Sequence, residues 1–188
     1  MLGLNPRLTR TLYTVLVVLL ALFVGSCGPA TSSLSSVVPY GVDLSGIWVL
    51  DETRSDAPPD NEAALQRLKA AEIEGKRSDA FGSILYATQD FPVIAADRLS
   101  VEQDSSSISI SYGDGQHRDL IWGLQTRAEW KVDAGWEQSR LVVKSFVSHT
   151  SGTERYQLDS DGDTLLVDVS VRAGPDRRNF RRTYTRSQ

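Results

Sequence analysis

The sequence predicts a mainly β domain in which an antiparallel meander closes into a barrel, with one helical insertion after the first strand. From residue 97 onward, short alternating runs of apolar and polar residues are separated by turns rich in Gly, Asp and Ser. These strands follow one another too closely for the long crossovers that parallel pairing needs. Strands at this regular spacing, joined by tight turns, are typical of an antiparallel meander that curls into a barrel.

The first strand is predicted over residues 43–51, where Ile47, Trp48 and Val49 stand between turn-forming residues. A break containing Pro58 and Pro59 follows. The first 42 residues contain no comparable strand signal; the short run 36–38 is the only alternative for an earlier strand.

The inserted segment, residues 60–96, begins with a helical pattern over 60–75. Asp60 or Asn61 is suited to the N-cap, and apolar residues recur at helical spacing. We expect this helix to lie across one end or one face of the barrel, with Leu65 and Leu68 buried. Residues 76–96 are ambiguous, except that Pro92 must interrupt any helix there.

The remaining strands are predicted from alternation and turns. Within 107–112 apolar residues alternate with serine, as in a strand with one face buried. Residues 139–148 are partly apolar on both faces, so we expect this strand to be covered on both sides. Turns are predicted at 113–115, 133–135, 159–163 and 172–177, and strands at 98–103, 107–112, 120–122, 126–132, 139–148, 153–158, 164–171 and 179–186.

The N-terminus has the features of a secretory signal: Arg7 and Arg10, then a short apolar run over 11–24. The run is shorter than the roughly 20 residues of a membrane-spanning helix. Val24-Gly25-Ser26-Cys27 resembles the lipobox of bacterial lipoproteins, although an ordinary signal peptide with a chance cysteine is the alternative. The resemblance implies that residues 1–26 are removed, that Cys27 is acylated, and that several acyl chains anchor the protein.

Composition limits the remaining functions. Residues 27–42, rich in Ser, Pro and Gly, are predicted to be a flexible tether, and residues 43–188 a single domain. Without the two signal arginines the chain holds 18 basic and 24 acidic residues, a net charge of −6, which argues against nucleic-acid binding. Cys27 is the only cysteine, so stability must come from an apolar core rather than from a disulfide.

The segment Leu44-Ser45-Gly46-Ile47-Trp48 contains a Gly-x-Trp pattern that resembles the first strand of lipocalin and fatty-acid-binding-protein barrels. The segments 154–158 and 161–165 look like those of uncharacterised lipocalin-like envelope proteins of bacteria. The resemblance implies a barrel over residues 43–186 and the carriage of a small apolar ligand or an accessory role in the envelope. It implies no reaction and no cofactor.

The same resemblance implies that Trp48 plugs the closed end of the barrel beneath an arginine from the last strand. Strand parity places Arg182 and Arg186 on the inward face together with Phe180 and Tyr184. A guanidinium over an indole ring is stabilising and ties the first strand to the last. We expect Arg182 to make this contact, with Arg186 as the second choice.

No catalytic or metal site is predicted. His117 and His149 stand in loop-like segments without a nucleophile motif beside them. The acidic turn at 159–163 lacks the residue order of a calcium-binding loop and is typical of a hairpin. The arginines near the C-terminus are interpreted as a solvated edge, with a phosphate or lipid head group as the alternative.

Two functions therefore stand open, and neither is enzymatic. In the first, an envelope lipoprotein, expected at the outer membrane facing the periplasm because Gly28 rather than Asp follows Cys27, holds a small apolar or lipid-like ligand. In the second, a filled barrel engages another envelope protein. The predicted pocket residues are those that strand parity points inward: Ile108, Ile110, Tyr112, Trp130, Val167 and Val169.

Overall fold

The structure, a computed structural model, describes residues 34–74, 88–113 and 115–187. They form one ten-stranded antiparallel sheet with the strand order β4-β3-β2-β1-β10-β9-β8-β7-β6-β5. The strands are β1 (Gly46–Leu50), β2 (Arg98–Gln103), β3 (Ser107–Ser111), β4 (His117–Ile121), β5 (Gly123–Arg127), β6 (Trp130–Glu137), β7 (Arg140–Val147), β8 (Thr150–Leu158), β9 (Thr164–Ala173) and β10 (Asp176–Arg186).

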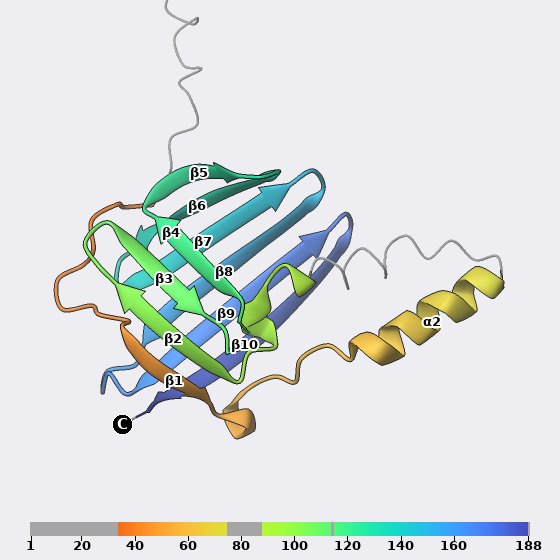
Figure 1. The fold of residues 1–188 in the computed structure, drawn as a ribbon, viewed down its shortest axis with the longest axis horizontal. Coiled ribbons are helices and arrows are strands. Elements are labelled where there is room, and N and C mark those ends of the chain that lie inside the picture. The colour runs from red at the N-terminus through yellow and green to blue at the C-terminus, as the bar shows by residue number, and fades with distance from the viewer. Residues whose placement is uncertain (1–33, 75–87, 114, 188) are drawn as a thin grey trace, which may run out of the picture. The chain divides into compact units, whose positions relative to one another are not determined.

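The sheet curls so that its two halves face each other across a buried interior (Figure 1). β1 pairs with β2 on one side and with β10 on the other, and so joins a meander of four strands to a meander of six. The edge strands β4 and β5 are consecutive in the chain but are not paired with each other. The predicted fold class, an antiparallel meander that forms a nearly closed barrel with an insertion after the first strand, is confirmed.

The region around β5 and β6 differs from the prediction. Residues 126–132 do not form one strand, because a turn at Ala128, whose φ is 52°, divides them between β5 and β6. Asp133, Ala134 and Gly135 are not a turn but lie inside β6. Gly135 is in the strand for a packing reason: a Cβ there would lie 2.7 Å from the Ser35 carbonyl oxygen and 2.8 Å from the Leu34 Cβ.

Part of the predicted tether is packed against the sheet. Leu34 is buried, and Ser35 exchanges two backbone hydrogen bonds with Trp136, of 3.0 and 2.9 Å. Residues 27–33, with the proposed acylation site Cys27, lie outside the described residues. β7 is buried on both faces from Leu141 to Val143, as its composition predicts.

The insertion begins with the short helix η1 (Glu52–Arg54), followed by the helix α2 (Asn61–Ile73). Asp60 caps α2, since its carboxylate accepts a 2.9 Å hydrogen bond from the Ala63 amide. The prediction that Leu65 is buried is wrong: its exposed fraction is 40%. The side chain of Leu68 lies outside the described residues, and no described helix has the length and apolar character to cross a membrane.

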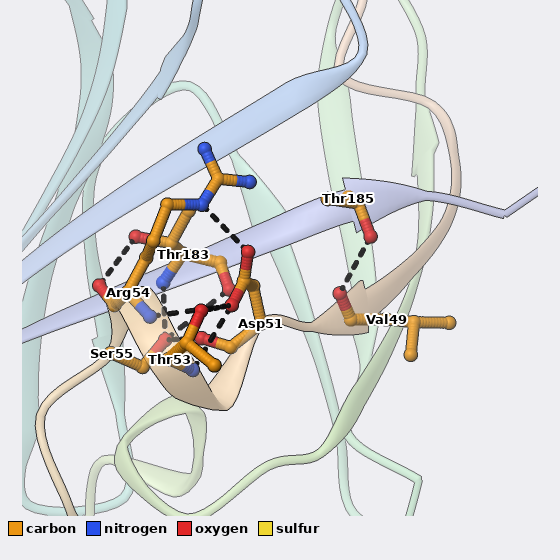
Figure 2. A network of polar contacts seen from close by, with 7 residues as sticks. All are labelled: Val49, Asp51, Thr53, Arg54, Ser55, Thr183 and Thr185. Atoms are coloured by element: carbon orange, nitrogen blue, oxygen red, sulfur yellow. Dashed lines mark hydrogen bonds and ion pairs between the residues drawn. The ribbon is translucent and has the colours of Figure 1, made fainter.

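A polar network attaches the turn after β1 to the last strand (Figure 2). The Asp51 carboxylate accepts hydrogen bonds from the Thr53 amide and hydroxyl and from the Arg54 guanidinium, and the Asp51 amide donates to the Thr183 carbonyl. The Thr183 amide in turn donates to the Ser55 hydroxyl at 2.9 Å. These contacts fix the point at which the inserted segment leaves the barrel wall.

Trp48 is fully buried, and an arginine of the last strand lies over its ring as predicted. The arginine is Arg186, whose Cζ is 4.2 Å from the ring centroid. Arg186 also donates to the carbonyl oxygens of Ser45 at 2.6 Å and Gly162 at 3.2 Å. The contact therefore joins β1, β10 and the turn before β9 at one end of the barrel.

The first choice for this contact, Arg182, is wrong. Arg182 does point inward, but Arg186 is the cross-strand partner of Trp48, and four residues along a strand is a distance of about 13 Å. Arg182 is instead buried near the middle of β10, where it donates to the backbone carbonyls of Asp56 and Ala96. It therefore ties the inserted segment to the barrel wall.

Candidate ligand site at the mouth of the barrel

The segment 88–97, which precedes β2, packs on β6 and β8 through Phe91 and accepts hydrogen bonds from the Tyr184 hydroxyl of β10; we call this part of the barrel the mouth. Pro92 starts the short helix η2 (Pro92–Ile94), and Phe91, Val93 and Ile94 are all buried. The Phe91 ring packs on Gly152 of β8, where a Cβ would lie 2.0 Å from its Cζ atom. It also contacts Trp130 of β6 edge-to-face, with ring centroids 6.1 Å apart. Phe91 thus fills the mouth from within.

A cavity of about 630 Å³ lies beside this segment. Its wall includes apolar side chains such as Phe91, Ile94 and Tyr112, and polar groups of Thr88 and Gln116. The remaining lining residues are Pro58, Pro59, Gln89, Pro92, Ala95, Ala96, Asp97, Arg98 and Gly113. This volume lies within the range of pockets that hold small molecules.

Behind the mouth, the interior of the barrel contains a cluster of polar side chains. Arg118 of β4 reaches across the interior to form an ion pair with Glu154 of β8, which is fully buried. Glu154 also accepts a 2.5 Å hydrogen bond from the Tyr156 hydroxyl, and Arg118 donates to the Ser145 hydroxyl at 2.8 Å. The Tyr112 hydroxyl is buried beside this group and makes no hydrogen bond of normal geometry.

Burial and charge set the protonation states of this cluster. The pKa of the Tyr112 hydroxyl is raised above its usual value, first by burial and then by the negative charge of Glu154. Tyr156 and Arg118 lie close enough to Tyr112 to lower its pKa, but the rise prevails. Burial and Glu154 likewise raise the pKa of Tyr156. Burial opposes the charged form of Arg118, yet the neighbouring Glu154 raises the pKa of Arg118 overall, and the guanidinium stays charged. Because the pKa values of Tyr112 and Tyr156 are both raised, the two tyrosines are neutral hydrogen-bond donors beside an ion pair.

A second, smaller cavity of about 140 Å³ is lined by residues of both the mouth and this cluster. Arg118, Arg127, Asp90 and Phe91 line it together with Trp130, Val132 and Ser145. The pKa of Asp90 is raised, mainly by burial and next by the charge of Glu129, while Arg118 opposes the rise. Phe91 lines both cavities and so stands between them.

The predicted pocket residues divide into two groups. Tyr112 lines the larger cavity and Trp130 the smaller one. Ile108, Ile110, Val167 and Val169 do point inward, but they are packed in the apolar core and line neither of these cavities. His117 and His149 are exposed, and the described residues contain no group of three side chains that could hold a metal ion.

Sequence reasoning missed Phe91, Arg118 and Glu154 as site residues. One signal was available: Glu154 and Tyr156 are two residues apart in a predicted strand, so parity places both on the inward face. A carboxylate facing a barrel interior requires a partner. Nothing in the sequence spacing identifies that partner as Arg118, because the two residues meet only across the folded barrel.

Neither known protein families nor curated proteins match the chain. Similar solved structures are the wild-type fluorescent protein UnaG (12% identity, 77% of this chain and 97% of that chain covered, TM-score 0.47). Another is fatty-acid-binding protein 1 of Echinococcus granulosus, with 12% identity, 77% of this chain and 98% of that chain covered, and a TM-score of 0.45. A third is a zebrafish ileal bile acid-binding protein complexed with cholic acid, with 12% identity, 76% of this chain and 98% of that chain covered, and a TM-score of 0.43.

Proposed function

We propose that this protein binds a small apolar or lipid-like molecule at the mouth of its barrel. The observation that carries the proposal is the cavity of about 630 Å³ lined by the segment 88–98 and Tyr112. The deep interior is filled by core side chains, including Ile110, Val167 and Val169. The ligand therefore enters beside Phe91 and reaches the buried polar cluster when that ring moves aside.

Native mass spectrometry of the full chain purified from membranes tests this proposal. We expect a fraction of the protein to carry an apolar adduct of small-molecule mass, and Phe91→Ala to change the retained fraction because Phe91 lines the site. Leu124→Ala is the matched control, since Leu124 is an exposed apolar residue on β5. If the protein retains neither a co-purifying molecule nor added hexadecanol, the proposal is wrong.

A second candidate function, the engagement of another protein, is favoured by large apolar side chains on the barrel exterior. Ile121, Leu124 and Phe146 have exposed fractions of 55, 59 and 51%. In the same mass spectra this function would appear as a protein adduct, and the triple replacement of these residues by Ser would remove that adduct without removing a small-molecule adduct.

We also propose that Cys27 is acylated and anchors the protein to the cell envelope. The support is the short apolar run that ends in a lipobox-like sequence. Labelling of growing cells with a fatty-acid analogue should mark the wild-type chain and not Cys27→Ala. Equal labelling of the two chains would refute the anchor, and it would leave the ligand proposal untouched.

A further inference from the structure

The buried polar cluster of Arg118, Glu154 and Tyr112 contributes little to the stability of the folded state. Glu154 is fully buried with Arg118, and a buried ion pair is often no more stabilising than apolar side chains of similar volume. The Tyr112 hydroxyl, whose residue is only 2% exposed, makes no hydrogen bond of normal geometry. A buried donor without a good acceptor destabilises the folded state. Stability alone therefore gives no reason for this arrangement.

The position of Tyr112 suggests a reason. Its side chain belongs to the wall of the larger cavity and also lies beside the Glu154–Arg118 pair. A molecule in that cavity would contact Tyr112, whose hydroxyl is covered and lies deeper, on the side of the ion pair. The other polar residues of the wall, Thr88, Gln89, Asp97, Arg98 and Gln116, belong to the larger cavity alone and not to this cluster. We infer that Tyr112 donates a hydrogen bond to a neutral oxygen acceptor, a hydroxyl or a carbonyl, on the apolar ligand, with Arg118 and Glu154 beside its hydroxyl. This inference rests on the proposed function.

Charge selects a neutral group over a carboxylate. Arg118 already donates to Glu154 and to Ser145, and the charges of Arg118 and Glu154 cancel. The two other charged residues that line the smaller cavity, Asp90 and Arg127, also have opposite signs, and so do the two that line the larger cavity, Asp97 and Arg98. A ligand carboxylate at Tyr112 would add a second negative charge near Glu154 and lose its hydration, with no net positive charge in the lining of either cavity to compensate for it.

Competition among ligands that differ only at the head tests this inference. The full chain is incubated with an equimolar mixture of 1-hexadecanol, methyl palmitate and palmitate, and the retained molecules are measured by native mass spectrometry. We expect the alcohol and the ester to be retained over the acid. Tyr112→Phe should lower retention of the alcohol about three- to tenfold, the effect of one lost hydrogen bond. Tyr40→Phe, which changes a fully exposed tyrosine, should leave retention unchanged.

Two further readouts separate a binding role from a structural one. Tyr112→Phe removes a buried hydroxyl without a good partner, so its melting temperature should equal or exceed that of the wild type while alcohol retention falls. Glu154→Gln leaves Arg118 without its counter-charge, so this variant should shift retention toward palmitate. If Glu154→Gln does not fold, the Tyr112→Phe comparison decides alone.

The outcomes are distinct. If the wild type retains all three ligands equally, or if Tyr112→Phe retains the alcohol as well as the wild type does, this inference is wrong and the proposed function stands. A preference of the wild type for palmitate also overturns it. If the wild type retains none of the three, the proposed function fails and the inference fails with it.

Discussion

At the scale of single residues, Arg186 joins the first strand of the barrel to the last. It stacks on Trp48 and satisfies the carbonyls of Ser45 and Gly162. Removing the stacked cation and these hydrogen bonds by Arg186→Ala should lower the free energy of unfolding by about 1–3 kcal/mol. Urea unfolding measures the change. Arg178→Ala, an exposed substitution on the same strand, should change stability by less than about 0.5 kcal/mol, and equal losses in the two variants would contradict the prediction.

Asp51 makes part of the stability depend on pH. Hydrogen bonds from Thr53 and Arg54 lower its pKa from 3.8 to about 2. The unfolded chain therefore takes up this proton first, so the carboxylate stabilises the folded state above pH 4 and ceases to do so as the pH falls toward 2. Asp51→Asn should melt below the wild type at pH 7, and the gap should narrow as the pH approaches 2. A gap independent of pH would mean that the carboxylate charge has no part in the effect.

At the scale of elements, the mouth segment depends on a glycine of β8. Gly152→Ala places a methyl group within 2.0 Å of the Phe91 ring, so the ring and the segment 88–97 must move. We expect amide hydrogen exchange in 88–97 to become faster in this variant while exchange in β9 and β10 stays slow. The double variant Gly152→Ala with Phe91→Ala should restore slow exchange relative to Gly152→Ala, because the smaller side chain makes room for the new methyl group. If amide exchange in 88–97 stays fast in the double variant, the clash with the Phe91 ring is not the cause of the faster exchange.

Most strands could be predicted from the sequence, and the strands and turns around β6 could not. Alternation located most strands, since the buried positions of β2, β3 and β9 recur every second residue. It failed around β5 and β6 because the hairpins on either side of β6 turn at Ala128 and Gln138, with φ of 52° and 56°, rather than at glycine. Conversely, Gly135 resembles a turn residue in the sequence but lies inside β6. A side chain has no room at this position because Leu34 and Ser35 pack against its backbone. In both cases the cause is a contact or a backbone conformation that composition does not encode.

The candidate site was predictable only in part for a similar reason. Parity identifies which side chains point inward, and Tyr112 and Trp130, which it placed there, each line one of the two cavities. That they bind a ligand stays a prediction. The inward position of Arg182 was also correct, but its partners Asp56 and Ala96 lie between β1 and β2, before and after α2, in stretches that have no periodic pattern. Contacts across a barrel depend on strand stagger and on the inserted segment, and neither follows from local spacing.

At the scale of the whole molecule, the pairing of β1 with β10 determines how the chain can fold. Apart from β1 and β2, which the inserted segment separates, neighbouring strands are joined by short connections, whereas Val49 and Thr185 are separated by 136 residues (Figure 2). Closing so long a loop carries a large entropic cost, which slows folding until other contacts are in place. We therefore expect the two meanders to form first and the β1–β10 seam to close after the main kinetic barrier. Stopped-flow measurements on Arg186→Ala should then show faster unfolding with a nearly unchanged refolding rate, whereas slower refolding would place the seam in the folding nucleus. A seam that closes last also opens first, so the most frequent partial unfolding of this barrel should separate its first strand from its last while each meander stays intact.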